Sequence, residues 1–328
     1  MKLLFIGGTG IISSGCVAVA LERGLDVTLL NRGQRAVLPE GCRHLRADIR
    51  DPDQARRALD GQAFDAVVDF VAFEPAHVET DLDLFRGCCG QLVFIGSASA
   101  YQTPPGTLPI TEDTPLDNPF WAYSRQKIAC EQRLRRAMEE GVPATIVRPS
   151  HTYGRGPFPY DGGYTVLQRI RDGRPVVVPG DGTSVWTMTH HRDFAVGLLG
   201  LLGHPAALGE AFHITNDEWL TWNGIFATLG HHLGREPRLA HVPTAAIRKA
   251  DAEWGASVWG DKAHSAIFDN GKLRRLVPEF GTTIRFEDGA RDIVEWYLED
   301  PTRCTVDAHF DALQDRLAAI YARALASV

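Results

Sequence analysis

The sequence lacks the features that would place a protein in a membrane, secreted or fibrous class. No apolar run approaches the roughly 20 residues that a helix needs to cross a bilayer. The start has one lysine, a short apolar run and then a Gly-rich turn, which is unlike a secretory signal. We therefore expect a cytoplasmic protein without a membrane partner. The 44% of hydrophobic residues and 23% of charged residues are typical of a globular chain.

Basic residues and metal-ligand spacings are also scarce. Lys and Arg number 34 against 41 Asp and Glu, a formal charge of −7. This balance argues against a nucleic-acid partner, because phosphate binding needs clustered cations. The six cysteines form no CxxC pair and no Cys–His spacing typical of zinc. We therefore expect no metal site.

Short apolar runs alternate with helical patterns through the first half of the chain, which predicts βαβ units and a buried parallel sheet. The fold class is therefore α/β, with a doubly wound sheet of Rossmann type. The expected strands cover 2–7, 26–31, 42–47, 66–72, 91–97 and 144–149. The expected helices cover 14–23, 53–59, 77–86, 123–140, 164–172, 221–234, 243–254 and 288–300.

The stretch GGTGIISSG (7–15) follows the first expected strand and opens a helix. Gly7 and Gly10 occupy the first two positions of a dinucleotide-binding turn, where main-chain amides and the helix dipole can hold a pyrophosphate. Ser13 stands at the third glycine position. Asn31 ends the second strand about 20 residues later, where such folds place the residue that reads the ribose. A tight βα turn without a ligand is the alternative interpretation.

The stretch WAYSRQK places Tyr123 and Lys127 four residues apart on one face of a helix. An ammonium group one turn away favours the phenolate, so we expect a lowered pKa for Tyr123, useful in proton transfer. Upstream, VFIGSASAY brings Ser97 and Ser99 to the carboxyl edge of the sheet, where open α/β folds bind ligands. Ser97 could polarise a substrate oxygen while Tyr123 exchanges its proton. A surface Tyr–Lys pair is the alternative.

Together these motifs resemble the extended short-chain dehydrogenase/reductase superfamily, the NAD-dependent epimerase/dehydratase family. The resemblance continues through RADIRD (46–51), SASAYQ (97–102), RPSHTYG (148–154) and GEAFHIT (209–215). It implies that Tyr123 is the general acid/base, that Lys127 tunes its pKa and contacts the cofactor ribose, and that Ser97 polarises the substrate oxygen.

The resemblance also implies a cofactor site, a substrate site and a homodimer formed through the helices at 77–86 and 123–140. The implied cofactor residues are Gly7, Thr9, Gly10, Ile11, Ile12, Asn31, Arg32, Asp48, Ile49, Val71, Ala72, Lys127, Pro149 and Ser150. The implied substrate residues are Ser99, His151 and Trp186. We expect an NAD(P)-binding domain over 1–160, with a return segment near 176–215, interleaved with a smaller, mostly helical substrate-binding portion over 161–328.

Several positions depart from the family pattern. Asn31 and Arg32 replace the NAD-selecting Asp, so the cofactor is NAD or NADP, and the guanidinium suits a 2′-phosphate. Ala98–Ser99 replaces the Asp–Glu pair of 4,6-dehydratases, which disfavours dehydration. Trp186 occupies the position of a diphosphate-binding Arg and could stack on a base or a sugar face, while Lys262 could substitute for a second such Arg.

The sequence favours an NAD(P)-dependent epimerase that acts on a secondary alcohol of a sugar, nucleotide sugar or nucleoside-like metabolite. Such an enzyme works through a transient ketone and keeps its NAD tightly bound. Net NADP(H)-dependent reduction or oxidation of a sugar-like ketone or alcohol is the second hypothesis. A cofactor-sensing or RNA-associated protein without catalysis is the third.

Overall fold

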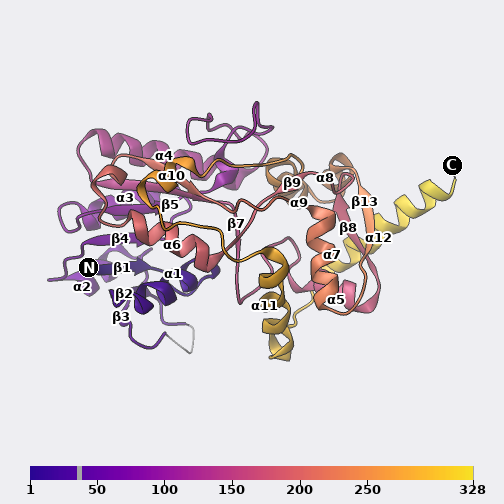
Figure 1. The fold of residues 1–328 in the computed structure, drawn as a ribbon, viewed down its shortest axis with the longest axis horizontal. Helices are drawn as coiled ribbons and strands as arrows, with labels where there is room; N and C mark the ends of the chain where they lie inside the picture. The colour runs from indigo at the N-terminus through magenta and orange to yellow at the C-terminus, as the bar shows by residue number, and fades with distance from the viewer. Residues whose placement is uncertain (35–38, 328) are drawn as a thin grey trace.

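A seven-stranded sheet forms the centre of the computed structural model, which describes residues 1–34 and 39–327 (Figure 1). The strands pair in the order β11-β6-β5-β4-β1-β2-β3, and every pairing is parallel. Their bounds are Lys2–Ile6 (β1), Asp26–Asn31 (β2), Arg43–Arg46 (β3), Ala66–Asp69 (β4), Leu92–Ile95 (β5), Ala144–Pro149 (β6) and Ala211–Ile214 (β11). The chain moves outward from β1 on both sides, which confirms the predicted Rossmann-type doubly wound fold.

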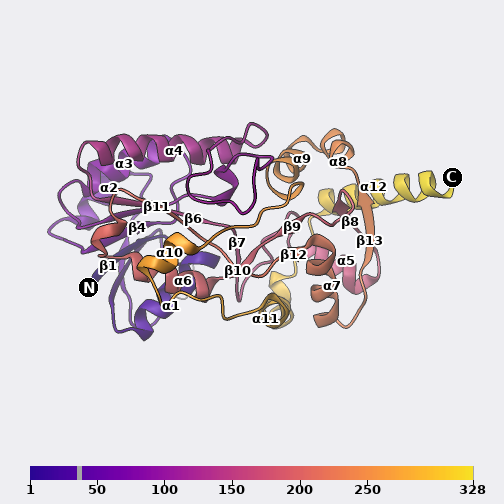
Figure 2. The ribbon, with the colours of Figure 1, turned by 45° about the horizontal axis from the view of Figure 1, so that its top comes forward.

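Helices cover both faces of this sheet, as Figure 2 shows. Alternate residues of β1 explain the two layers, because Leu3 and Phe5 pack into one apolar core while Leu4 and Ile6 pack into another. The helices on the first face are α1 (Ile11–Glu22), α6 (His191–Leu201) and α10 (Gly271–Leu276). Those on the second are α2 (Pro52–Leu59), α3 (Pro75–Phe85) and α4 (Ala122–Glu139).

The later part of the chain forms a mostly helical region with its own apolar core, to the right of the sheet in Figure 1. Its helices are α5 (Tyr164–Asp172), α7 (Trp222–His232), α8 (Thr244–Ala250), α9 (Ala252–Ser257), α11 (Phe286–Leu298) and α12 (Ala308–Ala326). Its two-stranded pairs are β7 (His151–Tyr153) with β10 (Met188–His190), β8 (Pro175–Pro179) with β13 (Arg238–Val242), and β9 (Val185–Trp186) with β12 (Leu220–Thr221). Of the return segment expected near 176–215, strand β11 joins the central sheet and helix α6 packs on it, whereas strand β8 pairs with β13 in the later region. The domain boundaries stay a prediction.

Two local features move element boundaries away from the expected ones. The fourth strand ends at Asp69 instead of residue 72, because the Asp69 carboxylate accepts the Val71 amide at 2.5 Å and turns the chain out of the sheet. The helix expected over 243–254 is broken at Asp251. This residue is extended, and its carboxylate accepts the Trp254 amide to cap a second helix.

Several expectations concern membranes, metals and partner subunits. Within 1–34 and 39–327, no helix combines the length and the apolar character of a membrane span. The same residues hold no group of three His, Cys, Asp or Glu side chains placed to bind a metal ion.

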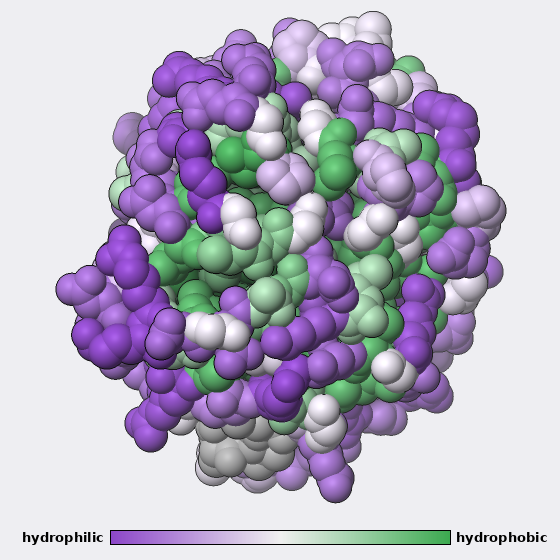
Figure 3. All heavy atoms as spheres, turned by 90° about the vertical axis from the view of Figure 1, so that its left-hand side faces the viewer, coloured by the Kyte–Doolittle hydropathy of each residue, from purple (hydrophilic) through white to green (hydrophobic). Residues whose placement is uncertain are grey.

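Figure 3 shows one face of the molecule, on which hydrophobic patches are separated by hydrophilic residues. The homodimer through α3 and α4 stays a prediction.

The imidazole ring of His191 packs between α1, which covers the sheet, and the segment that follows β7. His191 is the first residue of α6. A Cβ added at Gly15 of α1 would lie 2.7 Å from the carbonyl oxygen of His191. A Cβ added at Gly154, just after β7, would lie 2.6 Å from the same imidazole ring. The His191 Nδ1 also lies 3.0 Å from the Ile11 carbonyl oxygen. Both glycines are therefore required for the close approach of α1, α6 and β7.

Replacing Gly154 by alanine should lower the free energy of unfolding by about 1–3 kcal/mol, since the added methyl group overlaps the His191 ring, which also packs closely against Gly15 of α1. Gly156 is a matched control, because its Cβ would lie 3.6 Å from Ile11, an ordinary contact. Gly156→Ala should change the unfolding free energy by no more than about 0.5 kcal/mol. Urea unfolding followed by circular dichroism measures both, and equal effects would disprove the crowding at Gly154.

Candidate active site

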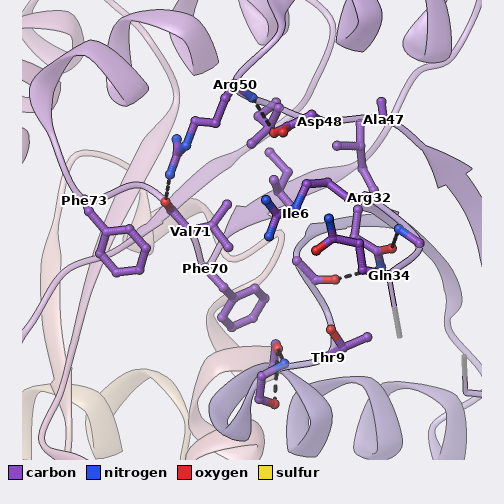
Figure 4. Close-up of a pocket in the computed structure, with 17 residues that line it drawn as sticks. Ile6, Thr9, Arg32, Gln34, Ala47, Asp48, Arg50, Phe70, Val71 and Phe73 are labelled. Carbon is purple, nitrogen blue, oxygen red and sulfur yellow. Dashed lines mark hydrogen bonds between the residues drawn. The ribbon is translucent and has the colours of Figure 1, made fainter. Parts of the chain in front are cut away.

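A cavity of about 430 Å³ lies over the carboxyl ends of β1, β2, β3 and β4, and we call it the cofactor pocket (Figure 4). The predicted cofactor residues that line it are Gly7, Thr9, Gly10, Asn31, Arg32, Asp48, Ile49 and Val71. In Figure 4, Thr9 and Phe70 lie on one side of the cavity and Asp48 and Arg50 on the other. Arg50, which the sequence analysis did not single out, donates a hydrogen bond to the Val71 carbonyl.

The Gly-rich turn of the cofactor pocket has the shape that a pyrophosphate requires. Gly7 and Gly8 have φ angles of 106° and 79°, a region that favours glycine. A Cβ at Gly8 would lie 2.6 Å from the buried Leu29 side chain, so any larger residue would collide with the core beneath the turn. The main-chain amides at the start of α1 could hold the phosphates of a dinucleotide. The residues present therefore fit NAD or NADP.

Ser13, at the third glycine position, binds the main chain of the turn through its hydroxyl. Its hydroxyl accepts a hydrogen bond from the Gly10 amide at 2.9 Å and also lies 3.4 Å from the Gly10 carbonyl. The hydroxyl is thus bound to the main chain of the turn itself. The close helix packing that the third glycine usually permits is provided by Gly15.

The side chain of Asn31 is already engaged at the ribose end of the cofactor pocket. Its amide oxygen accepts hydrogen bonds from the Gly33 amide and from His44 Nε2, both at 2.9 Å. Its amide nitrogen donates to the Gly7 carbonyl at 3.0 Å. Because an amide oxygen has two lone pairs, Asn31 has no acceptor left for a ribose hydroxyl. The neighbouring Arg32 lines the pocket and is exposed.

A second cavity of about 180 Å³ lies next to the cofactor pocket, and we call it the substrate pocket. The two are neighbours because Ser13 of α1 lines the first and Ile12 the second. The substrate pocket is lined by Ile12, Ser97, Ser99, Trp121, Tyr123, Pro149, Ser150, His151, Trp186 and Asp261. It therefore unites two predicted catalytic residues with all three predicted substrate residues. Ile11, Ala72 and Lys127 line neither cavity.

Three hydroxyl groups form a chain that ends at Ser97. Ser124 of α4 donates to Ser99 at 2.8 Å, and the Ser99 and Ser97 oxygens lie 2.9 Å apart. A Ser99 hydroxyl that accepts from Ser124 can donate to Ser97, which leaves the Ser97 proton for Tyr123 or for a ligand in the pocket. Ser124 lies within the WAYSRQK motif, but its hydroxyl role depends on the fold and is not visible in the sequence.

The structure contradicts the expectation that Lys127 lowers the pKa of Tyr123. Burial raises the pKa of Tyr123 to about 12, and a hydrogen bond with Ser97 opposes this only in part. The Lys127 ammonium instead donates to the carbonyls of Ala72 and Ile95, at 2.7 and 2.8 Å. Burial lowers the pKa of Lys127 to about 8, against the attraction of Asp69. Tyr123 is thus held in its protonated form.

Asp261 is a pocket residue that the sequence analysis missed. It comes from the helical turn η3 (Val258–Lys262) and lies 2.7 Å from His151 Nε2. Lys262, considered above as an anion ligand, is buried instead, within 3.3 Å of Asp261 and 3.4 Å of Asp161. Its ammonium is therefore engaged inside the protein and does not line the substrate pocket.

The fold and its two neighbouring pockets define a member of the extended short-chain dehydrogenase/reductase class. Residues 3–216 match the model of the NAD dependent epimerase/dehydratase family, and the chain belongs to that family. This finding confirms the resemblance that the motifs indicate.

Individual relatives differ in what their names describe. A 2′-dehydrokanamycin reductase from Streptomyces kanamyceticus is 31% identical, over 85% of this chain and 80% of that protein. The chloroplast stem-loop binding protein of 41 kDa b from Arabidopsis thaliana is 27% identical, over 73% of this chain and 65% of that protein. Among solved structures, UDP-glucose 4-epimerase from Bifidobacterium longum in complex with NAD+ and UDP has a TM-score of 0.74 at 18% identity, covering 92% of this chain and 100% of that one. That last likeness shows the fold alone.

Proposed function

We propose that this protein is an NADPH-dependent reductase of a ketone on a sugar-type ring. The observation that carries the proposal is the ribose end of the cofactor pocket. Both lone pairs of the Asn31 amide oxygen are used, and Arg32 offers a guanidinium where NAD-selecting folds offer a carboxylate. This arrangement suits a 2′-phosphate better than a ribose hydroxyl. A phosphorylated cofactor that exchanges after each turnover supports net reduction.

The substrate pocket supports a substrate without a diphosphate group. Among the described residues that line it there is no lysine or arginine, and Trp186 stands where the family has an arginine. A diphosphate would find no bidentate cation there. The similarity to a protein named 2′-dehydrokanamycin reductase is in agreement with a ketone substrate outside the nucleotide sugars.

The chain's own residues would act on the ketone oxygen. Bound NADPH supplies the hydride that reduces the carbonyl carbon. Ser97 donates a hydrogen bond to the oxygen, using the proton that the Ser124–Ser99 chain leaves free. Tyr123 transfers its phenolic proton to the same oxygen as charge develops on it, and solvent replaces that proton. Lys127, held by two carbonyls and lining neither pocket, would act as a positioning residue for Tyr123, whose ring centroid lies 5.8 Å from its ammonium.

Arg32→Ala should weaken NADPH binding by about 10- to 100-fold, the effect of losing a charge-assisted hydrogen bond to a phosphate. NADH binding should change little, because NADH lacks the 2′-phosphate. Fluorescence titration of both reduced nucleotides measures the two dissociation constants. Arg23→Ala, at the exposed end of α1, is the matched control for loss of a surface arginine. Equal loss of NADPH and NADH affinity would contradict a 2′-phosphate contact.

Epimerisation with tightly bound NAD is the second candidate. It is supported by relatives named UDP-glucose 4-epimerase, which match less than half of this chain. The one from Lactobacillus helveticus is 32% identical over 45% of this chain. The two functions differ in stoichiometry. A reductase consumes one NADPH per ketone, seen as a loss of nucleotide absorbance. An epimerase interconverts two alcohols without added cofactor, and NAD that survives purification with no net absorbance change would favour it.

A further inference from the structure

The ring of Phe73 lies between the cofactor pocket and the two residues Tyr123 and Lys127. Phe73 follows β4 and lines the cofactor pocket, and Figure 4 shows its ring at the edge of that pocket, beside Val71. Its ring centroid lies 6.4 Å from that of Tyr123, which lines the substrate pocket. Phe73 is 44% exposed and thus borders both parts of the site.

Three aromatic rings enclose the Lys127 ammonium. The ring centroids of Phe73, Phe94 and Tyr123 lie 4.6, 5.0 and 5.8 Å from the Lys127 Nζ atom. Phe94 belongs to β5 and is buried in the core, whereas Phe73 is the most exposed of the three rings. Lys127 itself is only 2% exposed and lines neither pocket. The Phe73 ring therefore separates the ammonium from the cofactor pocket.

The main chain that carries Phe73 is held by hydrogen bonds on both sides. The Phe73 and Glu74 amides donate to His77 Nδ1, at 3.1 and 3.2 Å. The preceding carbonyl, that of Ala72, accepts from the Lys127 ammonium at 2.7 Å. The same loop thus supplies an acceptor for the ammonium and a ring that covers it. A phenylalanine side chain has no hydrogen-bonding group, so replacing it leaves these main-chain contacts in place.

Two effects of the surrounding rings on the ammonium oppose each other. The face of an aromatic ring attracts a cation and favours the charged form, whereas the exclusion of water disfavours it. Exclusion of water prevails, because burial lowers the pKa of Lys127 to about 8 against the attraction of Asp69. The ring that separates the ammonium from the cofactor pocket therefore acts mainly as a barrier to water.

Other titratable or charged groups face Lys127 from the surrounding elements. They are Arg50, Asp69, His77, Tyr123, Cys130 and Glu131, with Asp81 next to Asp69. Burial raises the pKa of Cys130 to about 11 and that of Tyr123 to about 12, and it lowers the pKa of His77. Burial and the neighbouring Asp69 raise the pKa of Asp81. The charge of Lys127 is therefore best followed at the lysine itself.

We propose that Phe73 is a positioning residue of this reductase, a role that rests on the proposed function, and that it acts through Lys127. The Phe73 ring keeps water from the Lys127 ammonium and so sets the pH above which the charge beside Tyr123 is lost. Without the ring, water would stabilise the charged form, and the site would keep its ammonium to a higher pH.

Nuclear magnetic resonance of the full chain, isotope-labelled at the lysine ε carbons, measures the titration of Lys127 directly. The chain has only five lysines, and the signal that disappears in Lys127→Arg is that of Lys127. In the wild-type protein this signal should titrate near pH 8. In Phe73→Ala its midpoint should rise by about one pH unit, since water regains access to the ammonium. The rate of ketone reduction at saturating NADPH should then fall at a correspondingly higher pH.

Three further variants distinguish the cover over Lys127 from a general effect of substitution. Phe73→Tyr keeps the ring and should keep the wild-type midpoint. Phe73→Leu, a smaller change than alanine, should raise the midpoint by less. Trp219→Ala removes an exposed ring between β11 and β12, outside both pockets, and should leave the midpoint and the rate unchanged.

Two results would overturn the proposal. One is a midpoint that stays the same or falls in both Phe73→Ala and Phe73→Leu. The other is a raised midpoint in Phe73→Ala with no change in the pH dependence of the rate. Thermal unfolding identifies a variant that has lost its fold, and the exposed position of Phe73 makes such a loss unexpected.

The outcome is separable from that of the proposed function, because the lysine signal is measured without a ketone. A raised midpoint in Phe73→Ala, in a protein that consumes no NADPH with any ketone, would contradict the reductase and leave the cover over Lys127 standing. Consumption of NADPH by the wild-type protein, with an unchanged midpoint in Phe73→Ala, would contradict the role of Phe73 and leave the reductase standing.

Discussion

Tyr123→Phe is expected to lower the rate of ketone reduction by about 10²- to 10⁴-fold, the contribution of a positioned general acid. The variant loses the hydroxyl that would give its proton to the substrate oxygen, while the aromatic ring and its packing against Trp121 stay in place. NADPH affinity and the unfolding free energy should therefore change little. Loss of nucleotide absorbance with saturating ketone measures the rate.

The pH profile provides an independent readout of the same site. Tyr123, with its pKa raised to about 12, stays a proton donor across the usual range. Lys127, with its pKa lowered to about 8, is charged below that pH and neutral above it. Loss of this charge weakens the two hydrogen bonds that hold Lys127 beside the Tyr123 ring, so the wild-type rate should fall as the pH rises through about 8. Tyr164→Phe, which removes a hydroxyl bonded to Gln168 on α5, should keep the wild-type rate and profile. Full activity of Tyr123→Phe would support a role without catalysis.

Glu131→Leu is expected to lower the free energy of unfolding by about 3–5 kcal/mol, the cost of leaving a buried charge unpaired. Arg148 of β6 is fully buried, and its guanidinium donates to both oxygens of Glu131 on α4, at 2.7 to 3.2 Å. It also donates to the Tyr101 hydroxyl at 2.9 Å. Burial disfavours its charge, but Glu131 more than compensates and raises the pKa of Arg148. Denaturant unfolding of the purified variant measures the loss.

Two comparisons distinguish this effect from a general effect of removing a glutamate. Glu79→Leu breaks the ion pair with Arg133, which is more exposed, and should cost no more than about 1 kcal/mol. The double variant Glu131→Leu/Arg148→Met removes both buried charges and should regain most of the lost stability. A double variant less stable than Glu131→Leu would contradict this prediction and show that Arg148 stabilises the fold through other contacts, such as its hydrogen bond to Tyr101.

Local patterns were sufficient to predict the architecture. Each strand of the sheet is a short apolar run, and each crossover helix carries its own periodicity, so the parallel order follows from rules of handedness and connection. The Gly-rich turn and the Tyr123–Lys127 spacing are local as well. Ser97 and Tyr123 are distant in the sequence but line the same pocket, because Ser97 follows the end of β5 and Tyr123 lies in the first turn of α4.

Asp261 and the hydrogen-bond partners of Lys127 and Ser13 could not be predicted, for reasons that differ between them. Asp261 lies 110 residues from His151 in sequence, in a helical turn without a motif, so only the folded chain reveals the pair. Lys127 binds two main-chain carbonyls, and main-chain partners leave no mark in the sequence. Ser13 replaces a glycine, but its hydrogen bonds to Gly10 depend on the geometry of the turn.

The ring of His191 has a consequence for directed evolution of this protein. It fills the space between the helix that starts at the dinucleotide turn and the strand that carries His151, and the glycines on both sides leave no room for adjustment. Enlarging the cofactor pocket or the substrate pocket from this side would therefore shift α1, α6 and β7 together. Variants with an altered substrate range should instead be sought at Trp121, which comes from the segment before α4 and lines the substrate pocket but not the cofactor pocket.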